Sequence, residues 1–244
     1  MNVVFLGATK GIGRAVARTM AGRGDRIALL GRDVEDLKRS AADLEALGGS
    51  VPATIQCDLL DRATIEPALA SAWEALGKVD SVVVTAGLFG TQDALESDAD
   101  LRDRVLTADF TNTVHVCEAS AVRLIGDSGG TLCVLSSVAG DRPRKTVYLY
   151  GAAKAGLSFY LEGLDLKYRD AGLRTVLVKP GFIKTGMTEG LPVPPFATVP
   201  EAIAPAIVRA IDRGTGVAYV PGIWKFVMLA VCSLPKFVMR KLNF

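Results

Sequence analysis

The sequence is poor in the residues that build metal centres and disulfides. It has one histidine, His115, and four widely spaced cysteines, Cys57, Cys117, Cys133 and Cys232. A single histidine argues against a multi-histidine metal centre and a Ser-His nucleophile, so we expect no metal. The cysteines form no CxxC pair, and each stands in or beside an apolar run. We therefore expect reduced core residues in a cytoplasmic protein.

Strong charge and long apolar runs are absent as well. The formal net charge is +2 over 244 residues, which does not indicate a nucleic-acid partner. No stretch has the roughly 20 apolar residues that a membrane-spanning helix needs. The strand-like run Val3–Leu6 follows Met1 and Asn2 directly, so no signal peptide is expected. Half of the residues are hydrophobic, which suits one large globular domain with a substantial core.

Short apolar runs alternate with longer helical patterns along the chain. Strands that are apolar throughout, each followed by a helix, predict a parallel sheet covered on both faces. The pattern therefore predicts a single α/β domain of the doubly wound Rossmann type, with a long irregular segment, 181–199, as a lid. The expected strands are Val3–Leu6, Arg26–Leu30, Val51–Gln56, Ser81–Thr85, Thr131–Ser136, Arg174–Lys179 and Val217–Val220; the expected helices are Ile12–Arg23, Val34–Leu47, Thr64–Leu76, Leu101–Leu124, Val147–Asp170 and Pro200–Asp212.

A glycine-rich turn lies between the first strand and the first helix. Glycines there allow a tight turn and close backbone approach to a pyrophosphate, and the helix N-terminus directs N–H groups at the anion. A turn that merely connects strand to helix is the alternative, but its place after the first strand favours a dinucleotide site. The expected contacts come from Gly7, Thr9, Lys10, Gly11, Ile12 and Gly13.

The end of the second strand bears on the choice of cofactor. An acidic residue there suits the ribose 2′-hydroxyl of NAD, whereas an arginine suits the 2′-phosphate of NADP. Arg32 comes first after the strand, and Lys10 lies in the glycine turn, so NADP(H) is favoured over NAD(H). Asp33 complicates this choice, although it also reads as the N-cap of the next helix.

Two later strand ends point to the same site. Asp58, followed by Leu59, can accept a hydrogen bond from an adenine amino group, although it could instead cap the next helix, as could Asp61. Thr85-Ala86-Gly87 ends the fourth strand, where the backbone should face the cofactor. We therefore add Asp58, Leu59, Ala86 and Gly87 to the expected cofactor contacts.

Tyr150 and Lys154 stand four residues apart and so share one face of a helix. A phenol near its reference pKa of about 10 is a poor acid or base at neutral pH. An ammonium one turn away favours the phenolate, so we expect Lys154 to lower the pKa of Tyr150. Taken alone the pattern is weak, because an exposed tyrosine and a solvated lysine are equally compatible with it.

These motifs together resemble the short-chain dehydrogenase/reductase family over nearly the whole chain. The matching segments are Gly7–Gly13, Asp58, Thr85–Gly87, Ser136–Gly140, Tyr150–Lys154, Pro180-Gly181 and Thr185. The resemblance implies a seven-stranded parallel sheet of order 3-2-1-4-5-6-7 and a nicotinamide cofactor across the carboxyl ends of the strands. It also implies a homodimer or homotetramer.

The resemblance also assigns roles to individual residues. It places the catalytic serine thirteen residues before the tyrosine, at Ser137 and not Ser136. Ser137 would bind the substrate oxygen, Tyr150 would protonate it, and Lys154 would hold the ribose hydroxyls and bias the tyrosine. Pro180, Gly181 and Ile183 would form the wall behind the nicotinamide, and Thr185 would contact its carboxamide or the phosphates.

Two positions depart from the family pattern. Thr85 replaces an asparagine that is mainly structural, and threonine can hydrogen-bond similarly. Many members also carry an asparagine before the fifth strand, which supports a proton relay to the lysine. Two residues compete for the matching position: Asp109, whose carboxylate would take over the relay, and Asn112, which matches after a small shift.

The substrate side combines apolar and basic residues. The lid supplies Met187, Leu191, Val193 and Phe196, which suggests an apolar or amphiphilic substrate. Residues 142–145 form a basic cluster that is either a solvated charge run or an anion site. The tail, 223–244, is apolar with interspersed cations, and it should pack over the cleft or a subunit interface, or lie in a membrane interface. The tail and residues 139–144 are loosely similar to the branch of the family that reduces keto sugars on polyprenyl phosphates.

The sequence thus predicts an NADP(H)-dependent oxidoreductase that interconverts a carbonyl and a secondary alcohol. Residues 1–222 form its catalytic domain, and residues 223–244 form a tail of the same domain. The expected substrate is a small-molecule or lipid-linked carbonyl or alcohol. Two alternatives stay open: a catalytically silent dinucleotide-binding regulator or scaffold, and a membrane-surface protein that acts through its tail.

Overall fold

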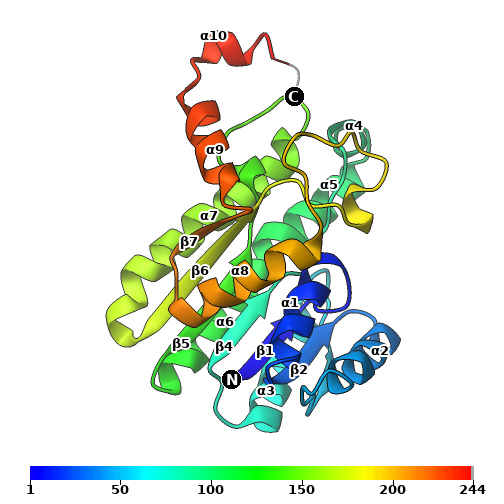
Figure 1. The fold of residues 1–244 in the computed structure, drawn as a ribbon, viewed down its shortest axis with the longest axis vertical. Coiled ribbons are helices and arrows are strands. Elements are labelled where there is room, and N and C mark those ends of the chain that lie inside the picture. Colours follow the sequence, from blue (N-terminus) through cyan, green and yellow to red (C-terminus); the bar gives the residue numbers. More distant parts are fainter. Residues whose placement is uncertain (243–244) are drawn as a thin grey trace.

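A seven-stranded sheet organises the chain, and all its strands are parallel. The computed structural model describes residues 1–242. The strand order is β3-β2-β1-β4-β5-β6-β7, as predicted (Figure 1). The strands are β1 (Asn2–Leu6), β2 (Arg26–Gly31), β3 (Thr54–Gln56), β4 (Ser81–Val84), β5 (Gly130–Leu135), β6 (Leu173–Pro180) and β7 (Val217–Val220).

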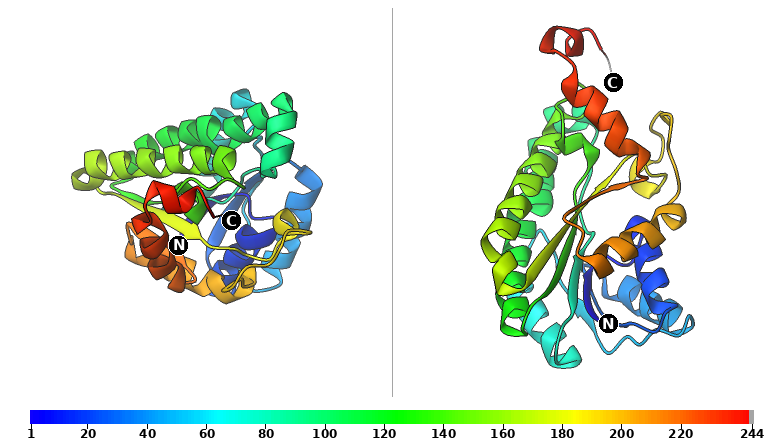
Figure 2. Two further views of the ribbon diagram at one scale, coloured as in Figure 1. Left: turned by 90° about the horizontal axis from the view of Figure 1, so that it is seen from above. Right: turned by 60° about the vertical axis from the view of Figure 1, so that its left-hand side comes forward.

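Two layers of helices cover the sheet, one on each face (Figure 2). Helices α1 (Gly11–Ala21), α2 (Val34–Glu45) and α8 (Pro200–Arg213) lie on one side, and α3 (Ile65–Leu76), α6 (Asn112–Gly126) and α7 (Tyr148–Tyr168) lie on the other. Alternate residues of β1 serve both layers, since Val3 and Phe5 pack with the first set and Val4 and Leu6 with the second. This two-sided burial explains why the strands are apolar throughout.

The long helix expected at Leu101–Leu124 is wrong in detail. The structure has α5 (Ala99–Leu106), a π-helical turn η2 (Thr107–Thr111) and then α6. An additional short helix, α4 (Gln92–Ser97), precedes them. Thr91 and Asp98 accept backbone hydrogen bonds at the starts of α4 and α5, and so divide the segment. The π turn is where Asp109 lies.

The remaining departures are smaller. Strand β3 begins at Thr54 and not at Val51, because Pro52 has no N–H to donate to a sheet ladder. Cys57, Cys117 and Cys133 are buried, but Cys232 is exposed, so the expectation of a core residue is wrong there. Short 3-10 helices occur at η1 (Arg62–Thr64), η3 (Val138–Gly140), η4 (Arg169–Ala171) and η5 (Gly186–Thr188).

The expected lid, 181–199, is a loop whose two ends are tied together. Ile183 and Thr198 form an isolated parallel bridge, and Lys184 N donates to Thr198 O at 2.8 Å. Between these ends the segment contains one short helix, η5. Met187, Val193 and Phe196 are exposed on it. The loop therefore has a fixed base and an apolar outer part.

The tail forms two helices at the end of the molecule opposite the N-terminus (Figure 1). Helix α9 (Ile223–Ser233) buries Trp224 and Met228 against Val138. Helix α10 (Lys236–Met239) has no buried residue. The base of the tail thus packs on its own domain, while its outer part projects from it. Among residues 1–242, no helix is long and apolar enough to cross a membrane.

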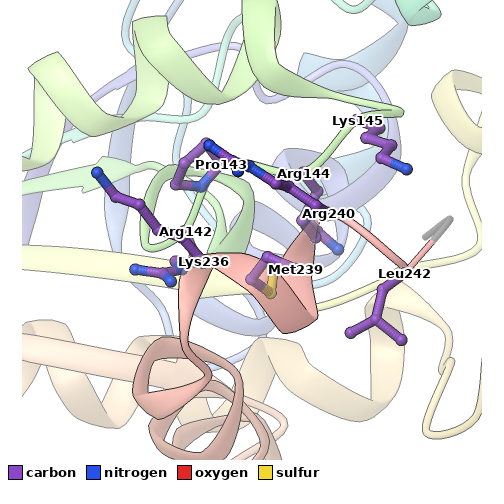
Figure 3. Close-up of a pocket in the computed structure, with 8 residues that line it drawn as sticks. All are labelled: Arg142, Pro143, Arg144, Lys145, Lys236, Met239, Arg240 and Leu242. Carbon is purple, nitrogen blue, oxygen red and sulfur yellow. The ribbon is translucent and has the colours of Figure 1, made fainter.

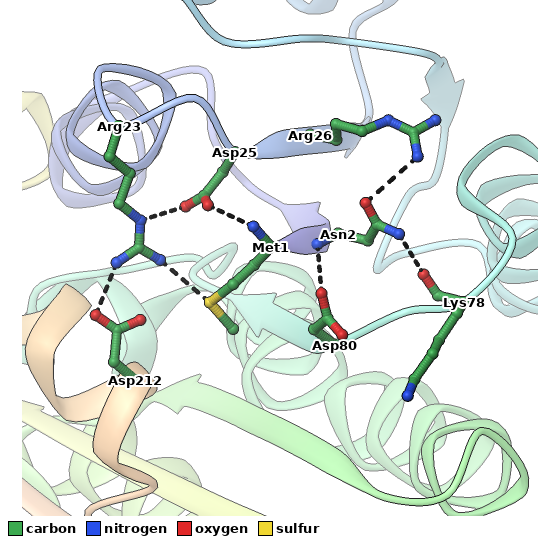
Figure 4. Close-up of polar contacts among 8 residues, drawn as sticks. All are labelled: Met1, Asn2, Arg23, Asp25, Arg26, Lys78, Asp80 and Asp212. Atoms are coloured by element: carbon green, nitrogen blue, oxygen red, sulfur yellow. Dashed lines mark hydrogen bonds and ion pairs between the residues drawn. The ribbon is translucent and has the colours of Figure 1, made fainter.

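A polar network closes the edge of the sheet at the amino ends of the strands (Figure 4). The N-terminal ammonium of Met1 lies 2.7 Å from Asp25 Oδ1, and Arg23 joins Asp25 to Asp212 of α8. Asn2 N donates to Asp80 Oδ2 at 2.8 Å. These contacts occupy the amino ends of the strands. Ligands of open parallel sheets bind at the carboxyl ends, so the candidate site is expected there.

Candidate active site

Two adjacent serines follow β5, and only the second faces the candidate site. Ser136 is buried, its Oγ donates to Lys154 O at 3.0 Å, and it lies 2.8 Å from Ser158 Oγ. Ser137 is partly exposed, and its Oγ accepts from Ala139 N at 3.1 Å as the N-cap of η3. Ser136 therefore braces α7, and Ser137 retains a hydroxyl proton for another partner.

Helix α7 brings Tyr150 and Lys154 to that serine. A side-chain hydrogen bond joins Ser137 to Tyr150, and Lys154 Nζ lies 5.6 Å from the centre of the Tyr150 ring. Phe89 packs against the same ring in a T-shaped arrangement, with 5.2 Å between the ring centres. Tyr148 points elsewhere, because it is exposed and its hydroxyl donates to Glu96 Oε1 at 2.9 Å. The structure thus brings the three predicted residues together at one strand end.

Asp109 is a fourth member of this cluster. Its Oδ2 lies 3.3 Å from Lys154 Nζ, and its Oδ1 accepts from Leu88 N at 2.6 Å. Asn112 is buried, and its amide donates to Leu59 O at 2.8 Å. Asp109 and not Asn112 is therefore the residue that contacts the lysine. π-helical turns often occur at functional sites, and η2 is what directs Asp109 there.

The pKa shifts reflect a buried, mutually dependent group of charges. Burial raises the pKa of the Asp109 carboxyl, although the Lys154 ammonium opposes this. Burial disfavours the Lys154 ammonium, but Asp109 and Tyr150 together outweigh burial, so the pKa of Lys154 is raised. Burial also raises the pKa of Tyr150. Lys154 lowers the pKa of Tyr150, as expected, but burial and Asp109 raise it by more than Lys154 and Ser137 lower it, so the net shift is upward.

Glycines hold these elements at short distances. A methyl group on Gly87 would lie 2.9 Å from Asp109 Oδ1 and 3.5 Å from Lys154 Nζ. A methyl group on Gly151, in the first turn of α7, would lie 2.7 Å from Ala139 O. The second contact sets how closely η3 approaches α7. Gly151 stands inside the Tyr-x-x-x-Lys motif, but a glycine in a helix gave no sign of this contact.

The glycine turn is closely packed beneath the candidate cofactor site. A methyl group on Gly7 would lie 2.4 Å from Ala86 N, and one on Gly13 would lie 2.1 Å from Gly7 O. Thr85 Oγ1 donates to Gly7 O at 2.9 Å, which gives Thr85 the structural role expected of it. No side chain caps the first N–H groups of α1, and its first turn has no acidic residue. These donors fit a pyrophosphate.

Two cations and one acidic residue lie near the start of α2. Lys10 of the glycine turn lies with its Nζ 3.1 Å from Asp36 Oδ2, which holds it near the start of α2. Arg32 precedes the first residue of that helix by two positions. Arg32 is exposed. Asp33 Oδ1 accepts from Asp36 N at 2.9 Å as the N-cap of α2. Asp33 is therefore already engaged as a helix cap.

The other expected cofactor residues lie around the same strand ends. Asp58 Oδ1 accepts from Leu60 N at 2.9 Å, while Asp61 caps η1. The backbone of Ala86 donates to Leu6 O at 3.2 Å, beside Gly7. Thr185 caps η5 and lies beside the glycine turn, because its methyl carbon would be 3.4 Å from a methyl group on Gly11. The remaining expected residues keep their places next to these: Thr9 and Ile12 in the glycine turn, Leu59 buried after Asp58, Pro180 at the end of β6, and Ile183 buried at the base of the lid.

Trp224 is a site neighbour that the sequence motifs missed. A methyl group on Gly181 would lie 2.0 Å from Trp224 Nε1, so the indole of α9 packs directly on the wall expected behind the nicotinamide. The indole nitrogen is buried, and within the described chain it has no hydrogen-bond partner. Trp224 lies more than forty residues from Gly181 in the sequence, so no local pattern joins the two.

The fold and these strand-end residues define a dinucleotide-binding protein of the Rossmann type. A family model described as short chain dehydrogenase matches residues 1–193. The chain therefore belongs to the short-chain dehydrogenase family, and it is an oxidoreductase of that family. Members of the family bind a nicotinamide dinucleotide.

Relatives and solved structures agree with this assignment. An uncharacterized oxidoreductase of Streptomyces coelicolor is 35% identical over 99% of this chain and 95% of its own length. One of Mycobacterium tuberculosis is 33% identical over 98% of this chain and 96% of its own. Carbonyl reductase family member 4 of Xenopus tropicalis is 30% identical over 76% of each. A short-chain dehydrogenase from Sphingobium yanoikuyae in complex with NADPH superposes with a TM-score of 0.81 at 25% identity, and covers 100% of this chain and 97% of its own.

Proposed function

We propose that the protein is an NADP(H)-dependent oxidoreductase that interconverts a carbonyl group and a secondary alcohol. The observation that carries the proposal is the approach of Ser137 and Lys154 to Tyr150 near the carboxyl end of β5, with Asp109 behind the lysine. A hydroxyl pair next to a buried ammonium suits proton transfer to and from an oxygen.

The chain's own residues have separate roles in this reaction. Ser137 donates a hydrogen bond to the substrate oxygen and stabilises the negative charge that develops there. Tyr150 gives its phenolic proton to that oxygen during reduction and takes it back during oxidation. Lys154 stabilises the tyrosinate that remains, and Asp109 fixes the position and charge of Lys154. When bound, the nicotinamide cofactor supplies or accepts the hydride.

The preference for NADP(H) rests on the β2–α2 turn. A 2′-phosphate placed there meets Arg32 and Lys10, and Asp33 is occupied as the cap of α2. The solved relative in complex with NADPH supports the same choice. The glycine turn, the uncapped start of α1, Asp58, Ala86, Gly87, Pro180, Gly181, Ile183 and Thr185 would hold the rest of the cofactor.

The substrate is proposed to be apolar or linked to a lipid. The outer part of the lid exposes Met187, Val193 and Phe196, and α9 closes the other side of Gly181 through Trp224. Apolar side chains that are exposed on a loop beside a catalytic site suit an apolar substrate, which would cover them.

Self-association is proposed for the outer faces of α6 and α7. Val122, Phe159 and Leu166 lie there with 68%, 83% and 86% of their surface exposed. A homodimer or homotetramer would bury them. Sedimentation of the wild-type chain and of a Phe159→Ser, Leu166→Ser double variant tests this, since the variant should dissociate.

A substrate screen tests the proposed reaction. The purified protein is mixed with NADPH or NADH and a panel of ketones that includes steroids and lipid-linked keto sugars, and the reduced-nicotinamide absorbance is followed. The reverse reaction is run with NADP and the matching alcohols. Turnover with NADPH that exceeds turnover with NADH supports the proposal. Cofactor binding without any turnover over the whole panel would instead favour the catalytically silent alternative.

A further inference from the structure

A basic pocket lies between the chain segment before α7 and the tail (Figure 3). Its volume is about 280 Å³, just below the range of about 300–1,000 Å³ typical of ligand sites. Five of its eight lining residues are cationic and none is acidic: the lining consists of Arg142, Pro143, Arg144, Lys145, Lys236, Met239, Arg240 and Leu242. The two segments meet in space although about ninety residues separate them.

Specific contacts build this pocket. Arg142 Nη2 donates to Leu234 O at 2.6 Å, which fastens the segment before α7 to the turn between α9 and α10. Arg144 Nε is buried and has no hydrogen-bond partner in the described chain. Burial lowers the pKa of the Arg144 guanidinium, although Asp141 opposes this. A buried guanidinium N–H without an acceptor is a hydrogen-bond donor that an anion could accept from.

The two tail helices, of which α10 lines the pocket, expose apolar side chains to solvent. Helix α9 turns Trp224 and Met228 inward and leaves Phe226 and Leu229 with 65% and 68% of their surface exposed. Phe237 of α10 is 66% exposed. The segment 223–244 contains four cations and no Asp or Glu. Exposed aromatic and aliphatic groups interspersed with cations are the composition of a helix that lies in a membrane interface.

We propose that α9 and α10 dock the protein on a bilayer that contains anionic phospholipid, with a lipid phosphate bound in this pocket. Free phosphate would satisfy the cations but would leave Phe226, Leu229 and Phe237 in water. An anionic bilayer accounts for the cations and for the apolar side chains, because head-group phosphates bind the cations and the apolar side chains insert between the head groups and the acyl chains. Helices α9 and α10, which carry these apolar side chains, lie at one end of the molecule, and α10 also lines the pocket (Figure 1). That end also holds the candidate active site, so docking would present the site to the membrane.

Vesicle flotation of the intact chain tests this proposal. The probes are vesicles of phosphatidylcholine alone and vesicles of an equimolar mixture with phosphatidylglycerol. We expect flotation with the mixture only, and less of it as salt increases. An Arg144→Gln, Arg240→Gln variant should bind the mixture about 30-fold more weakly, from about fivefold for each cation near the surface.

Matched variants separate the pocket from overall charge and from misfolding. Arg26→Gln with Lys78→Gln removes the same charge at the opposite edge of the sheet and should float like the wild type (Figure 4). Because Arg144 is partly buried, a Lys236→Gln, Arg240→Gln variant of the exposed helix α10 is tested beside it, and it should weaken binding similarly. Phe226→Ser with Phe237→Ser should weaken flotation without changing the charge.

Several results would overturn the proposal. One is equal flotation with both vesicle types or equal flotation of the pocket variants and the wild type. Another is a chain that binds inorganic phosphate, measured by thermal shift at constant ionic strength, but does not float, which would assign the pocket to a soluble phosphorylated ligand. A chain that does not float and forms an oligomer that the Phe226→Ser, Phe237→Ser variant disrupts would assign this face to a second copy.

Discussion

The ammonium of Lys154 lies 3.3 Å from Oδ2 of Asp109, and the two side chains are 5% and 0% exposed. This buried ion pair stands between the phenol of Tyr150 and the backbone of Leu88. It determines how the candidate site holds a proton, because each charge of the pair shifts the pKa of the other and that of Tyr150.

Removal of the charge of Asp109 should move the pH profile. In the wild type, the Asp109 carboxylate raises the pKa of both Tyr150 and Lys154. Asp109→Asn removes this charge but keeps an acceptor for Leu88 N. Both pKa values should therefore fall. Reduction needs a protonated Tyr150, so the alkaline decline of kcat/KM should start at lower pH in the variant. A profile that is unchanged would mean that Asp109 does not act on the site electrostatically.

Removal of the lysine should destabilise the fold in a pH-dependent manner. Lys154→Met leaves the buried Asp109 carboxylate without its partner, which typically costs about 3–5 kcal/mol. Burial already raises the pKa of Asp109 above the ordinary 3.8, so the folded variant binds a proton more tightly than the unfolded chain. The deficit in unfolding free energy relative to wild type should then shrink as the pH falls from neutral toward 4. Urea denaturation at several pH values measures it, and a deficit that grows in acid contradicts the account.

The close approach around Gly87 predicts a strong effect of one methyl group. Gly87→Ala places a carbon 2.9 Å from Asp109 Oδ1, so the ion pair must shift and activity should fall by about tenfold or more. Gly163→Ala, on the exposed face of α7, meets nothing within 4 Å and should be neutral or stabilise by up to about 1 kcal/mol. Steady-state kinetics and thermal melts of the two variants give the comparison. Similar activity in the Gly87→Ala and Gly163→Ala variants would contradict the inference that the close contact at Gly87 positions Asp109.

The cofactor assignment predicts a selective loss. Arg32→Ala should weaken NADPH binding about tenfold or more, the usual size for one charge-assisted hydrogen bond to phosphate, and leave NADH binding nearly unchanged. Lys78→Ala, at the opposite edge of the sheet, serves as the control for loss of a surface cation (Figure 4). Fluorescence titrations with both nucleotides measure the effect. An equal loss for both, or a preference of the wild type for NADH, would contradict the role of Arg32.

Much of the fold followed from local patterns, whereas several site contacts did not. Apolar strands that alternate with amphipathic helices predict the sheet, and glycines after the first strand mark the phosphate turn, because these signals lie within a few residues. The meeting of Asp109 with Lys154 depends on a π turn that helical periodicity did not reveal. The packing of Trp224 on Gly181 and the pocket between residues 142–145 and α10 join segments far apart in sequence. Only the tertiary structure places those side chains together.

The most direct test of the central claim is hydride transfer in a Tyr150→Phe variant, followed with NADPH and a ketone that the wild type reduces. The variant keeps the aromatic ring that packs on Phe89 and removes only the hydroxyl. The account predicts NADPH binding and unfolding free energy close to those of the wild type, with turnover reduced by several orders of magnitude. Turnover comparable to that of the wild type would contradict the role of Tyr150 as the proton donor.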